Sequence, residues 1–150
     1  MNKSALDSFR AASRKYSDTS ILMHEAISRK AGLSGTDHKY LGLLIENGPM
    51  TAGELSHRTG LTGGAVTGLI DRLEKKKLAK REFDKEDRRK VYIVPNKANA
   101  MELLTPLFKE LQQKTAKLLS SYSDSQLEII KKYMIDASLV MNDVLNKLKE

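Results

Sequence analysis

Residues 61–90 read LTGGAVTGLIDRLEKKKLAKREFDKEDRRK, and the interpretation of the whole chain depends on this stretch. Its first half predicts an amphipathic helix that begins after the capping residue Thr62 and buries Ala65, Val66, Leu69, Ile70 and Leu73. Apolar and polar residues then alternate, which predicts strands over 78–83 and 91–94 with a charged hairpin tip between them. Residues 72–90 contain ten Lys or Arg and five Asp or Glu, so they hold five of the seven net positive charges of the chain. A localised cationic helix and hairpin suits the phosphate backbone of a nucleic acid duplex.

The preceding residues predict a second short helix. Thr51-Ala52-Gly53-Glu54 has the form of a capping box, which would open a helix over Ala52–Thr59 with Leu55 buried. Gly60 can adopt a left-handed turn before Leu61 packs inward. Two short helices joined by a tight glycine-containing turn predict a helix-turn-helix.

Long helices are predicted on both sides. Residues 4–31 form a helical stripe interrupted around Ser17–Ser20 and ended by Gly32, and either Ser34 or Thr36 caps the next helix, which Asn47-Gly48-Pro49 ends. Residues 97–121 predict a helix that Pro106 either kinks or marks as a staggered start. A capping box at Ser123 and Gln126 opens a last helix to about Lys147. Its predicted buried positions are Leu127, Ile130, Tyr133, Met134, Ala137, Val140, Met141, Val144, Leu145 and Leu148.

The predicted fold class is therefore mainly α with a small β-wing, a winged helix-turn-helix. The lobe covers 33–96, and residues 1–32 and 97–150 form a helical region with little else in the chain to pack on. Such apolar helices usually find a partner subunit, so we expect a homodimer. The alternative is a monomer whose terminal helices fold back onto the lobe.

Composition excludes several function classes. The 150 residues contain no cysteine, which removes disulfides, thiolate catalysis and cysteine-based redox sensing. The charged N-terminus does not resemble a signal peptide, and no apolar run approaches the ~20 residues that span a bilayer, so a cytoplasmic protein without membrane partners is expected. His24, His38 and His57 do not share a ligand spacing, so no metal site is expected. No catalytic motif is present, and we do not expect an enzyme.

From Leu33 to about Ala100 the chain resembles the MarR family of winged helix-turn-helix transcription regulators. The matching motifs are Asn47-Gly48-Pro49, Thr51 with Glu54-Leu55, Leu61-Thr62, Val66-Thr67, Ile70-Asp71-Arg72-Leu73-Glu74-Lys75 and Asp87-Arg88-Arg89. A subset of the family also has GGAVT in the recognition helix, as Gly63–Thr67 does here, and a proline such as Pro95 at the end of the wing. Lys77 and Asn99 depart from the family, which usually has glycine there; both would be turn or C-cap positions.

The resemblance implies an obligate homodimer, held by the terminal helices, whose two lobes bind a pseudo-palindromic DNA operator. The expected recognition-helix contacts are Thr62, Gly63, Gly64, Thr67, Gly68 and Arg72. The glycines would let the helix N-terminus approach phosphate closely. The alternative, close packing against the preceding helix, is strongest for Gly68. Thr62, Thr67 and Arg72 are then left to meet the major groove and its walls.

The expected wing contacts are Asp87, Arg88, Arg89 and Lys90. By resemblance, Asp87 orients Arg89 for the minor groove, while Arg88 and Lys90 meet phosphates. The alternative is an ordinary solvated charge run. The resemblance also implies a repressor that responds to a small aromatic or phenolic effector, without other cofactors. Candidate pocket residues are Tyr16, His38, Tyr40 and Phe108, although aromatic residues at helical spacing are usually core. The alternative function is a winged-helix adaptor that binds other proteins and has no specific DNA binding.

Overall fold

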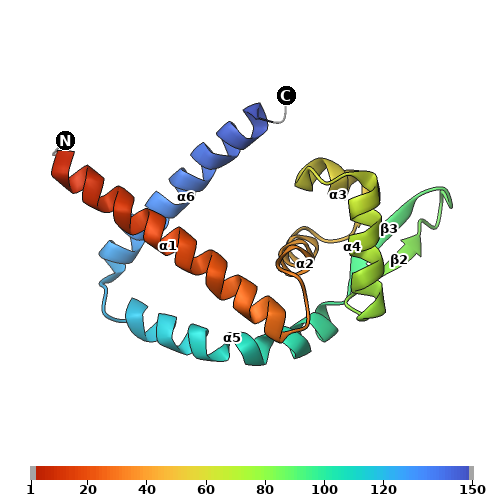
Figure 1. Ribbon diagram of the computed structural model, residues 1–150, viewed down its shortest axis with the longest axis horizontal. Helices are drawn as coiled ribbons and strands as arrows, with labels where there is room; N and C mark the ends of the chain where they lie inside the picture. The colour runs from red at the N-terminus through yellow and green to blue at the C-terminus, as the bar shows by residue number, and fades with distance from the viewer. Residues whose placement is uncertain (1–2, 149–150) are drawn as a thin grey trace. The chain divides into compact units, whose positions relative to one another are not determined.

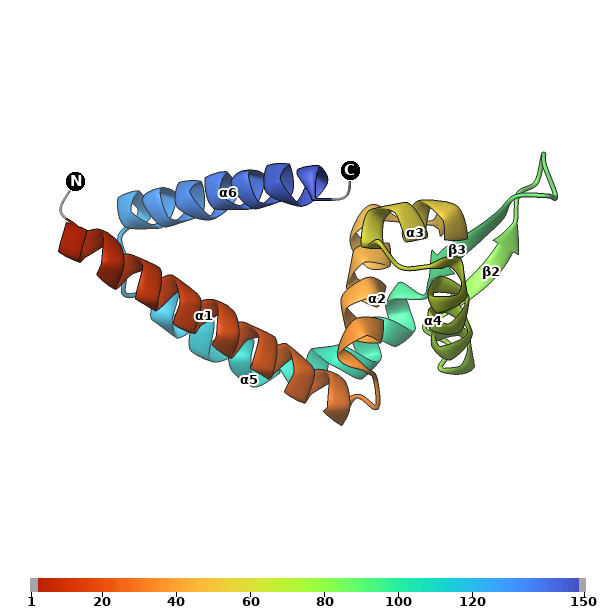
Figure 2. The same ribbon diagram turned by 45° about the horizontal axis from the view of Figure 1, so that its top comes forward.

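A computed structural model describes residues 3–148 (Figure 1). The elements in chain order are α1 (Lys3–Lys30), α2 (Gly35–Asn47), β1 (Met50–Thr51), α3 (Ala52–Thr59), α4 (Gly63–Lys75), β2 (Ala79–Phe83), β3 (Val91–Pro95), α5 (Lys97–Leu119) and α6 (Asp124–Lys147). The chain divides into two compact units, one that ends at Leu107 and one that begins at Phe108. Within the first unit, α2, α3 and α4 lie together and the β2–β3 hairpin projects from them (Figure 2).

Most helix boundaries follow local signals in the sequence. Ser34, and not Thr36, caps α2, with its side chain accepting a hydrogen bond from the Asp37 backbone N–H. Thr51 and Glu54 form the predicted capping box at the start of α3. Gly60 ends α3 in the left-handed conformation, with φ of 74°. Each signal acts within a few residues, so the sequence alone predicted the two ends of α3 and reduced the start of α2 to two candidate caps.

The interruption expected around Ser17–Ser20 is absent, because α1 is continuous from Lys3 to Lys30. Ser17, Asp18 and Thr19 are exposed on this helix. Serine, threonine and aspartate cost only a few tenths of a kcal/mol each in a helix relative to better formers, up to ~0.7. Neighbouring helix formers outweigh that cost.

The sheet is antiparallel with the order β1-β3-β2. In β2 and β3 the register runs from Ala79 opposite Pro95 to Phe83 opposite Val91, and both strands lie within one residue of the predicted bounds. Strand β1 was not predicted, because it consists of only Met50 and Thr51 and so has no alternation to read. It makes β3 the central strand.

The core of the first unit lies between α2, α3, α4 and the sheet. Its fully buried large side chains include Leu41 and Leu44 from α2, Leu55 from α3, Leu69 from α4 and Ile93 from β3. Burying one such side chain contributes roughly 1.5–3 kcal/mol relative to leaving it in water. This packing fixes one face of α4 inward. Ala65 was predicted on that face and is exposed instead, since it lies in the first turn beyond the packed residues.

The C-terminal end of α4 has a Schellman-type geometry. The Leu78 N–H donates to the Leu73 carbonyl at 2.9 Å, and the Lys77 N–H donates to the Glu74 carbonyl at 2.8 Å. Lys77 has φ of 57°, a left-handed conformation that glycine adopts without cost. Asn99 was predicted at a turn or C-cap position, but it lies at the start of helix α5. Its side-chain amide donates to the Lys77 carbonyl at 2.9 Å. The side chain thus supports this strained turn.

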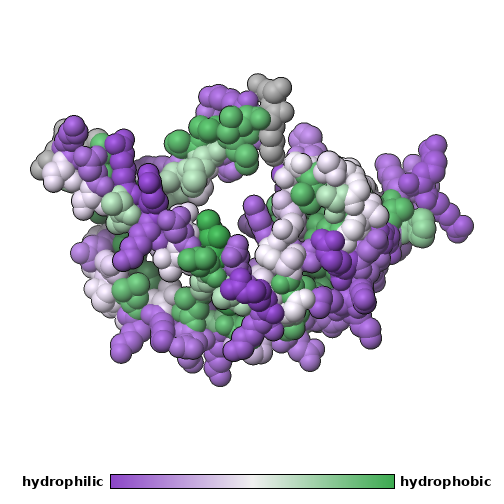
Figure 3. Space-filling view, viewed as in Figure 1, coloured by the Kyte–Doolittle hydropathy of each residue, from purple (hydrophilic) through white to green (hydrophobic). Residues whose placement is uncertain are grey.

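Helix α5 continues through Pro106 as one element, so no staggered start occurs there. The predicted buried face of α6 is not buried within one chain. Leu127, Ile130 and Ala137 are half-buried, and the other predicted positions are exposed. Apolar side chains gather over α6 in Figure 3. No helix within residues 3–148 is both long and apolar enough to cross a bilayer.

Candidate nucleic-acid interface

Helix α4 presents a bare outer surface at its N-terminus. Thr62 caps it, with the hydroxyl oxygen accepting from the Ala65 N–H at 3.3 Å. Val66 and Leu69 are fully buried, which directs the opposite side of the helix to solvent. Gly63 and Gly64 are exposed, and a Cβ added at either would meet no atom within 4 Å. Packing against the preceding helix therefore does not explain these two glycines.

Gly68 has a different environment. A Cβ added there would lie 3.3 Å from Nη1 of Arg72, on the same helix. Such a contact is tight, so the absence of a side chain at Gly68 makes room for the Arg72 guanidinium. The partner is thus an arginine on α4 itself, not the preceding helix.

Arg72 ties α4 to α2. Its Nε donates to Asp37 Oδ2 at 3.0 Å and its Nη2 donates to Asp37 Oδ1 at 2.7 Å, a bidentate pair. The Asp37 side chain is 4% exposed and that of Arg72 is 53% exposed. Burial raises the pKa of the Asp37 carboxyl, but hydrogen bonds from Arg72 and Ser34 outweigh burial and leave the pKa below its usual value. Arg72, a predicted DNA contact, is thus held by a buried carboxylate while part of it reaches solvent.

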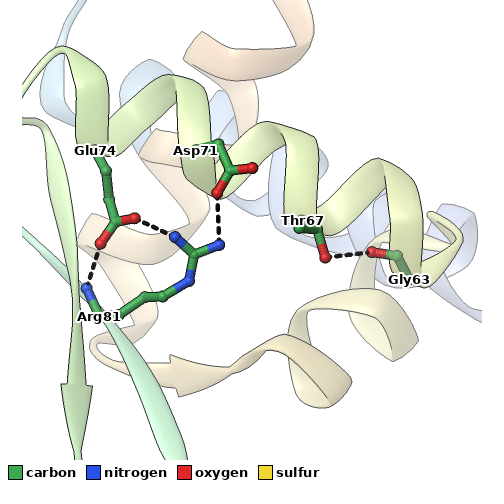
Figure 4. A network of polar contacts seen from close by, with 5 residues as sticks. All are labelled: Gly63, Thr67, Asp71, Glu74 and Arg81. Atoms are coloured by element: carbon green, nitrogen blue, oxygen red, sulfur yellow. Dashed lines mark hydrogen bonds and ion pairs between the residues drawn. The ribbon is translucent and has the colours of Figure 1, made fainter.

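Thr67 lies one turn beyond Gly63 on the exposed surface. Its hydroxyl donates to the Gly63 carbonyl at 3.0 Å (Figure 4). This bond uses the only hydroxyl proton and leaves the oxygen able to accept from an outside donor. The Thr62 hydroxyl has the opposite role, because its oxygen accepts a hydrogen bond from the Ala65 N–H in the cap and its proton is left to be donated. Two threonines five residues apart can therefore offer a donor and an acceptor.

The wing tip is ordered by aspartates. Asp84 Oδ1 accepts from the backbone N–H groups of Glu86 at 2.8 Å and Asp87 at 2.9 Å, and these bonds hold the pKa of Asp84 below its usual value. Arg89 Nε donates to Asp87 Oδ1 at 3.0 Å, while the Arg89 side chain is 92% exposed. The structure thus brings Asp87 and Arg89 together, as predicted, with most of the guanidinium in solvent.

Arg88 and Lys90 are also exposed. Hydrophilic side chains cover the tip of the hairpin in Figure 3. The wing and the bare face of α4 belong to the same compact unit, so one lobe carries both predicted DNA-contacting regions.

Sequence reasoning missed Arg81. This residue of β2 contacts two acidic residues of α4: Nη2 pairs with Asp71 Oδ1 at 2.7 Å, and Nη1 pairs with Glu74 (Figure 4). The Arg81 backbone N–H also donates to Glu74 Oε1 at 2.8 Å. In the strand alternation Arg81 lies on the same face as the buried Ala79. This was the one sequence signal from which a contact of Arg81 with α4 could have been predicted.

The predicted effector residues lie on three helices. Tyr16 is 68% exposed on α1, whereas His38 and Tyr40 are half-buried on α2. His38 stacks with His24 at a ring-centroid distance of 5.7 Å, and burial together with His24 lowers the pKa of His38. Phe108 belongs to the second unit. The four residues are thus divided between the two units, and the pocket they would form stays a prediction.

Another open pocket of about 710 Å³ lies beside the Asp37–Arg72 pair and is also lined by Gly32, Ser34, Thr36, Lys75 and Lys76. Within residues 3–148, no three His, Cys, Asp or Glu side chains are grouped as a metal ion would require.

Known proteins are similar to this chain in both sequence and fold. A model of the MarR family matches residues 31–90. The chain is 42% identical over 137 residues to YcgE of Bacillus subtilis (strain 168), described as an uncharacterized HTH-type transcriptional regulator, and the match covers 91% of this chain and 88% of YcgE.

Among solved structures, a MarR family protein from Bacillus stearothermophilus has a TM-score of 0.74 at 22% identity, covering 95% of this chain and 99% of the other. FabT of Streptococcus pneumoniae, solved in complex with DNA, has a TM-score of 0.72 at 17% identity, with coverages of 93% and 99%. These likenesses confirm the predicted winged-helix fold. Together with the sequence matches, they lead to one conclusion: this chain belongs to the MarR family of transcriptional regulators.

Proposed function

We propose that the protein is a sequence-specific, effector-responsive repressor that binds double-stranded DNA as a homodimer in the cytoplasm. The observation that carries this proposal is the combination, in one lobe, of a bare helix N-terminus and an exposed wing arginine. Gly63 and Gly64 leave the first N–H groups of α4 open to close approach, and Arg89 extends from the hairpin. FabT, a protein of the same fold, was solved in complex with DNA, which adds support.

On α4, the glycine N–H groups and the helix dipole would bind a phosphate. The Thr62 hydroxyl would donate to a neighbouring phosphate, while Thr67 would place its methyl against a thymine methyl and accept from an amino group of the next base. Arg72 would contact a wall of the groove with its exposed part, and Gly68 would leave room for that guanidinium. With so few long side chains on this face, much of the specificity would come from DNA shape.

In the wing, Arg89 would enter the minor groove with its orientation set by Asp87. Arg88 and Lys90 would neutralise phosphates and contribute salt-dependent affinity. Each of these two contacts would add about 0.9 to the slope of log affinity against log salt.

The homodimer is supported by the apolar side chains that one chain leaves exposed. On α6 these include Met134 at 50%, Val140 at 65% and Met141 at 64% exposure. A continuous apolar surface of this kind is normally covered by a partner, and a two-fold dimer covers it with the same surface of a second copy. Two lobes would then bind half-sites about one DNA turn, ~34 Å, apart.

The effector would be a small aromatic or phenolic molecule in contact with Tyr16, His38, Tyr40 and Phe108. Its binding would shift the dimer between arrangements in which the two recognition helices do or do not match the operator spacing. No other cofactor is proposed.

The test is selection of bound duplexes from random DNA, followed by footprinting of the selected sequence with and without a panel of phenols. A symmetric protected site that phenols release is expected. Thr67→Ala and Arg89→Ala should each weaken binding by roughly tenfold, the effect of losing one specific contact worth ~1.4 kcal/mol. If the wild-type protein enriches no sequence at moderate salt, the repressor proposal fails and the adaptor function takes its place.

A further inference from the structure

The outer part of the β2–β3 hairpin, beyond the buried Ala79 and Ile93, has little packing to hold it at a fixed angle to α4. Within β2 only Ala79 is buried, and the following four residues, Lys80 to Phe83, are exposed. Strand β1 supports the other edge of β3, and only at Ile93 and Tyr92. The outer part of the hairpin is thus a two-stranded ribbon in solvent, and such ribbons twist more than larger sheets do.

Arg81 connects this exposed ribbon to α4. Asp71 and Glu74 are three residues apart, so their carboxylates lie on the same side of the helix. Arg81 places one guanidinium nitrogen on each carboxylate, and its backbone N–H donates to Glu74. Side chain and main chain of the strand are therefore both bound to the helix. Among the contacts that the structure records for residues 3–148, this is the only ion-paired connection between β2 and α4.

The signs of these charges are unexpected for a surface that approaches DNA. Two carboxylates and one guanidinium leave the group with a net negative charge, and the Asp71 side chain is 60% exposed. A negative charge close to phosphate lowers affinity by repulsion. A compensating benefit is needed, and the geometry offers one, because the group joins the helix to the wing.

We propose that Arg81, Asp71 and Glu74 form a clamp that fixes the wing relative to the recognition helix, so that both can contact one DNA duplex at once. All three are positioning residues, and none needs to touch DNA. The proposal rests on the DNA binding proposed above.

The decisive test uses the opposite predictions of charge and geometry. Glu74→Gln and Asp71→Asn each remove a negative charge, so electrostatics alone predicts tighter DNA binding. The clamp predicts weaker binding, by roughly fivefold, as expected when a hydrogen-bonded ion-pair network worth about 1 kcal/mol is lost. Glu86→Gln is the matched control, since it removes a negative charge from the exposed hairpin tip and its carboxylate forms no recorded ion pair. It should bind as tightly as wild type or slightly tighter.

A double-mutant cycle separates positioning from a general loss of folding. Arg81→Ala should weaken binding to the selected duplex. In the Arg81→Ala background, Arg89→Ala should cost less affinity than in wild type, because a loosely held wing places Arg89 in the minor groove for less of the time. We expect the combined loss to be smaller than the product of the two single losses by at least about threefold. Arg81→Lys retains the charge but not the two-carboxylate geometry, and it should bind like Arg81→Ala with the wild-type salt slope. Circular dichroism and thermal unfolding would establish that each variant is folded.

The outcomes distinguish the clamp proposal from the proposal of DNA binding on which it rests. If wild type selects DNA but Glu74→Gln binds as tightly as Glu86→Gln, or if the Arg81 and Arg89 losses multiply fully, the clamp is refuted and the DNA-binding proposal stands. If wild type selects no DNA, the proposed function fails and the role of the clamp fails with it.

Discussion

Gly64→Ala should make the protein more stable and a weaker DNA binder at the same time. Gly64 lies in the first turn of α4 with a negative φ, and the added Cβ would meet no atom within 4 Å. The substitution therefore introduces neither backbone strain nor a clash. Restricting the unfolded chain at such a site stabilises the folded state by about 0.4–1 kcal/mol. For a chain of this length, that corresponds to an increase in Tm of roughly 1–4 °C.

The same methyl group would stand on the surface that approaches the duplex. It would separate the N–H groups of the helix N-terminus from the phosphate. Losing one hydrogen bond to a charged group costs roughly 1.5–3 kcal/mol, which is about a tenfold to hundredfold loss of affinity. Because alanine and glycine carry no charge, the salt dependence of binding should not change.

Gly42→Ala is the matched control. Gly42 is an exposed helical glycine of α2 where a Cβ would also meet nothing within 4 Å. It should raise stability to a similar extent without affecting DNA binding. Thermal unfolding at one protein concentration and gel-shift titration with the selected duplex measure the two effects. Wild-type affinity in Gly64→Ala, with the expected gain in Tm, would show that the helix N-terminus does not approach DNA closely.

Three further predictions concern stability and assembly. Lys77→Gly should raise the free energy of unfolding by about 1 kcal/mol, since it relieves the left-handed conformation at φ 57°; urea unfolding showing no gain would contradict this. Asp37→Asn should destabilise the fold by roughly 1–2 kcal/mol at pH 7, because the buried acceptor of Arg72 loses its charge. Because the pKa of Asp37 is lowered in the folded state, the stabilisation from its charge is complete above pH ~4 and is lost as the pH falls through the folded-state pKa. Wild type and Asp37→Asn should therefore converge in stability only in that acidic range. Val140→Glu should shift the protein toward monomer in sedimentation, whereas Lys132→Glu on the same helix should not; an unchanged mass for Val140→Glu would exclude this face from the interface.

The sequence predicted features set by neighbouring residues and missed those set by distant ones. Thr51 with Glu54, and Ser123 with Gln126, form capping boxes three residues apart, and both appear in the structure. The contact between Asp37 and Arg72 joins residues 35 apart, and no periodicity or motif announces it. Arg72 was therefore predicted only as a DNA contact, whereas two nitrogens of its guanidinium group donate to a carboxylate on another helix.

Errors of burial have a similar origin. The apolar periodicity of α6 correctly predicts a helix with apolar side chains at regular spacing, but it cannot state what covers them. Within one chain, residues such as Val140 and Met141 are exposed. For Gly68, the sequence left both DNA approach and packing open, and the structure shows that the nearby group is Arg72 of the same helix.

The polar connections of α4 are unevenly distributed along its length. Asp71, Arg72 and Glu74 bind other elements, and Lys77 closes the helix end, whereas the recorded side-chain hydrogen bonds of the N-terminal turn, made by Thr62 and Thr67, stay within α4 and its cap. Backbone amides at 63–67 should therefore exchange with deuterium faster than those at 70–75 in the free protein. On DNA, this gradient should flatten. Recognition would then include ordering of the first turn, an entropic cost offset by the favourable enthalpy of the contacts formed, so affinity should depend on temperature more steeply than for a helix that is rigid throughout.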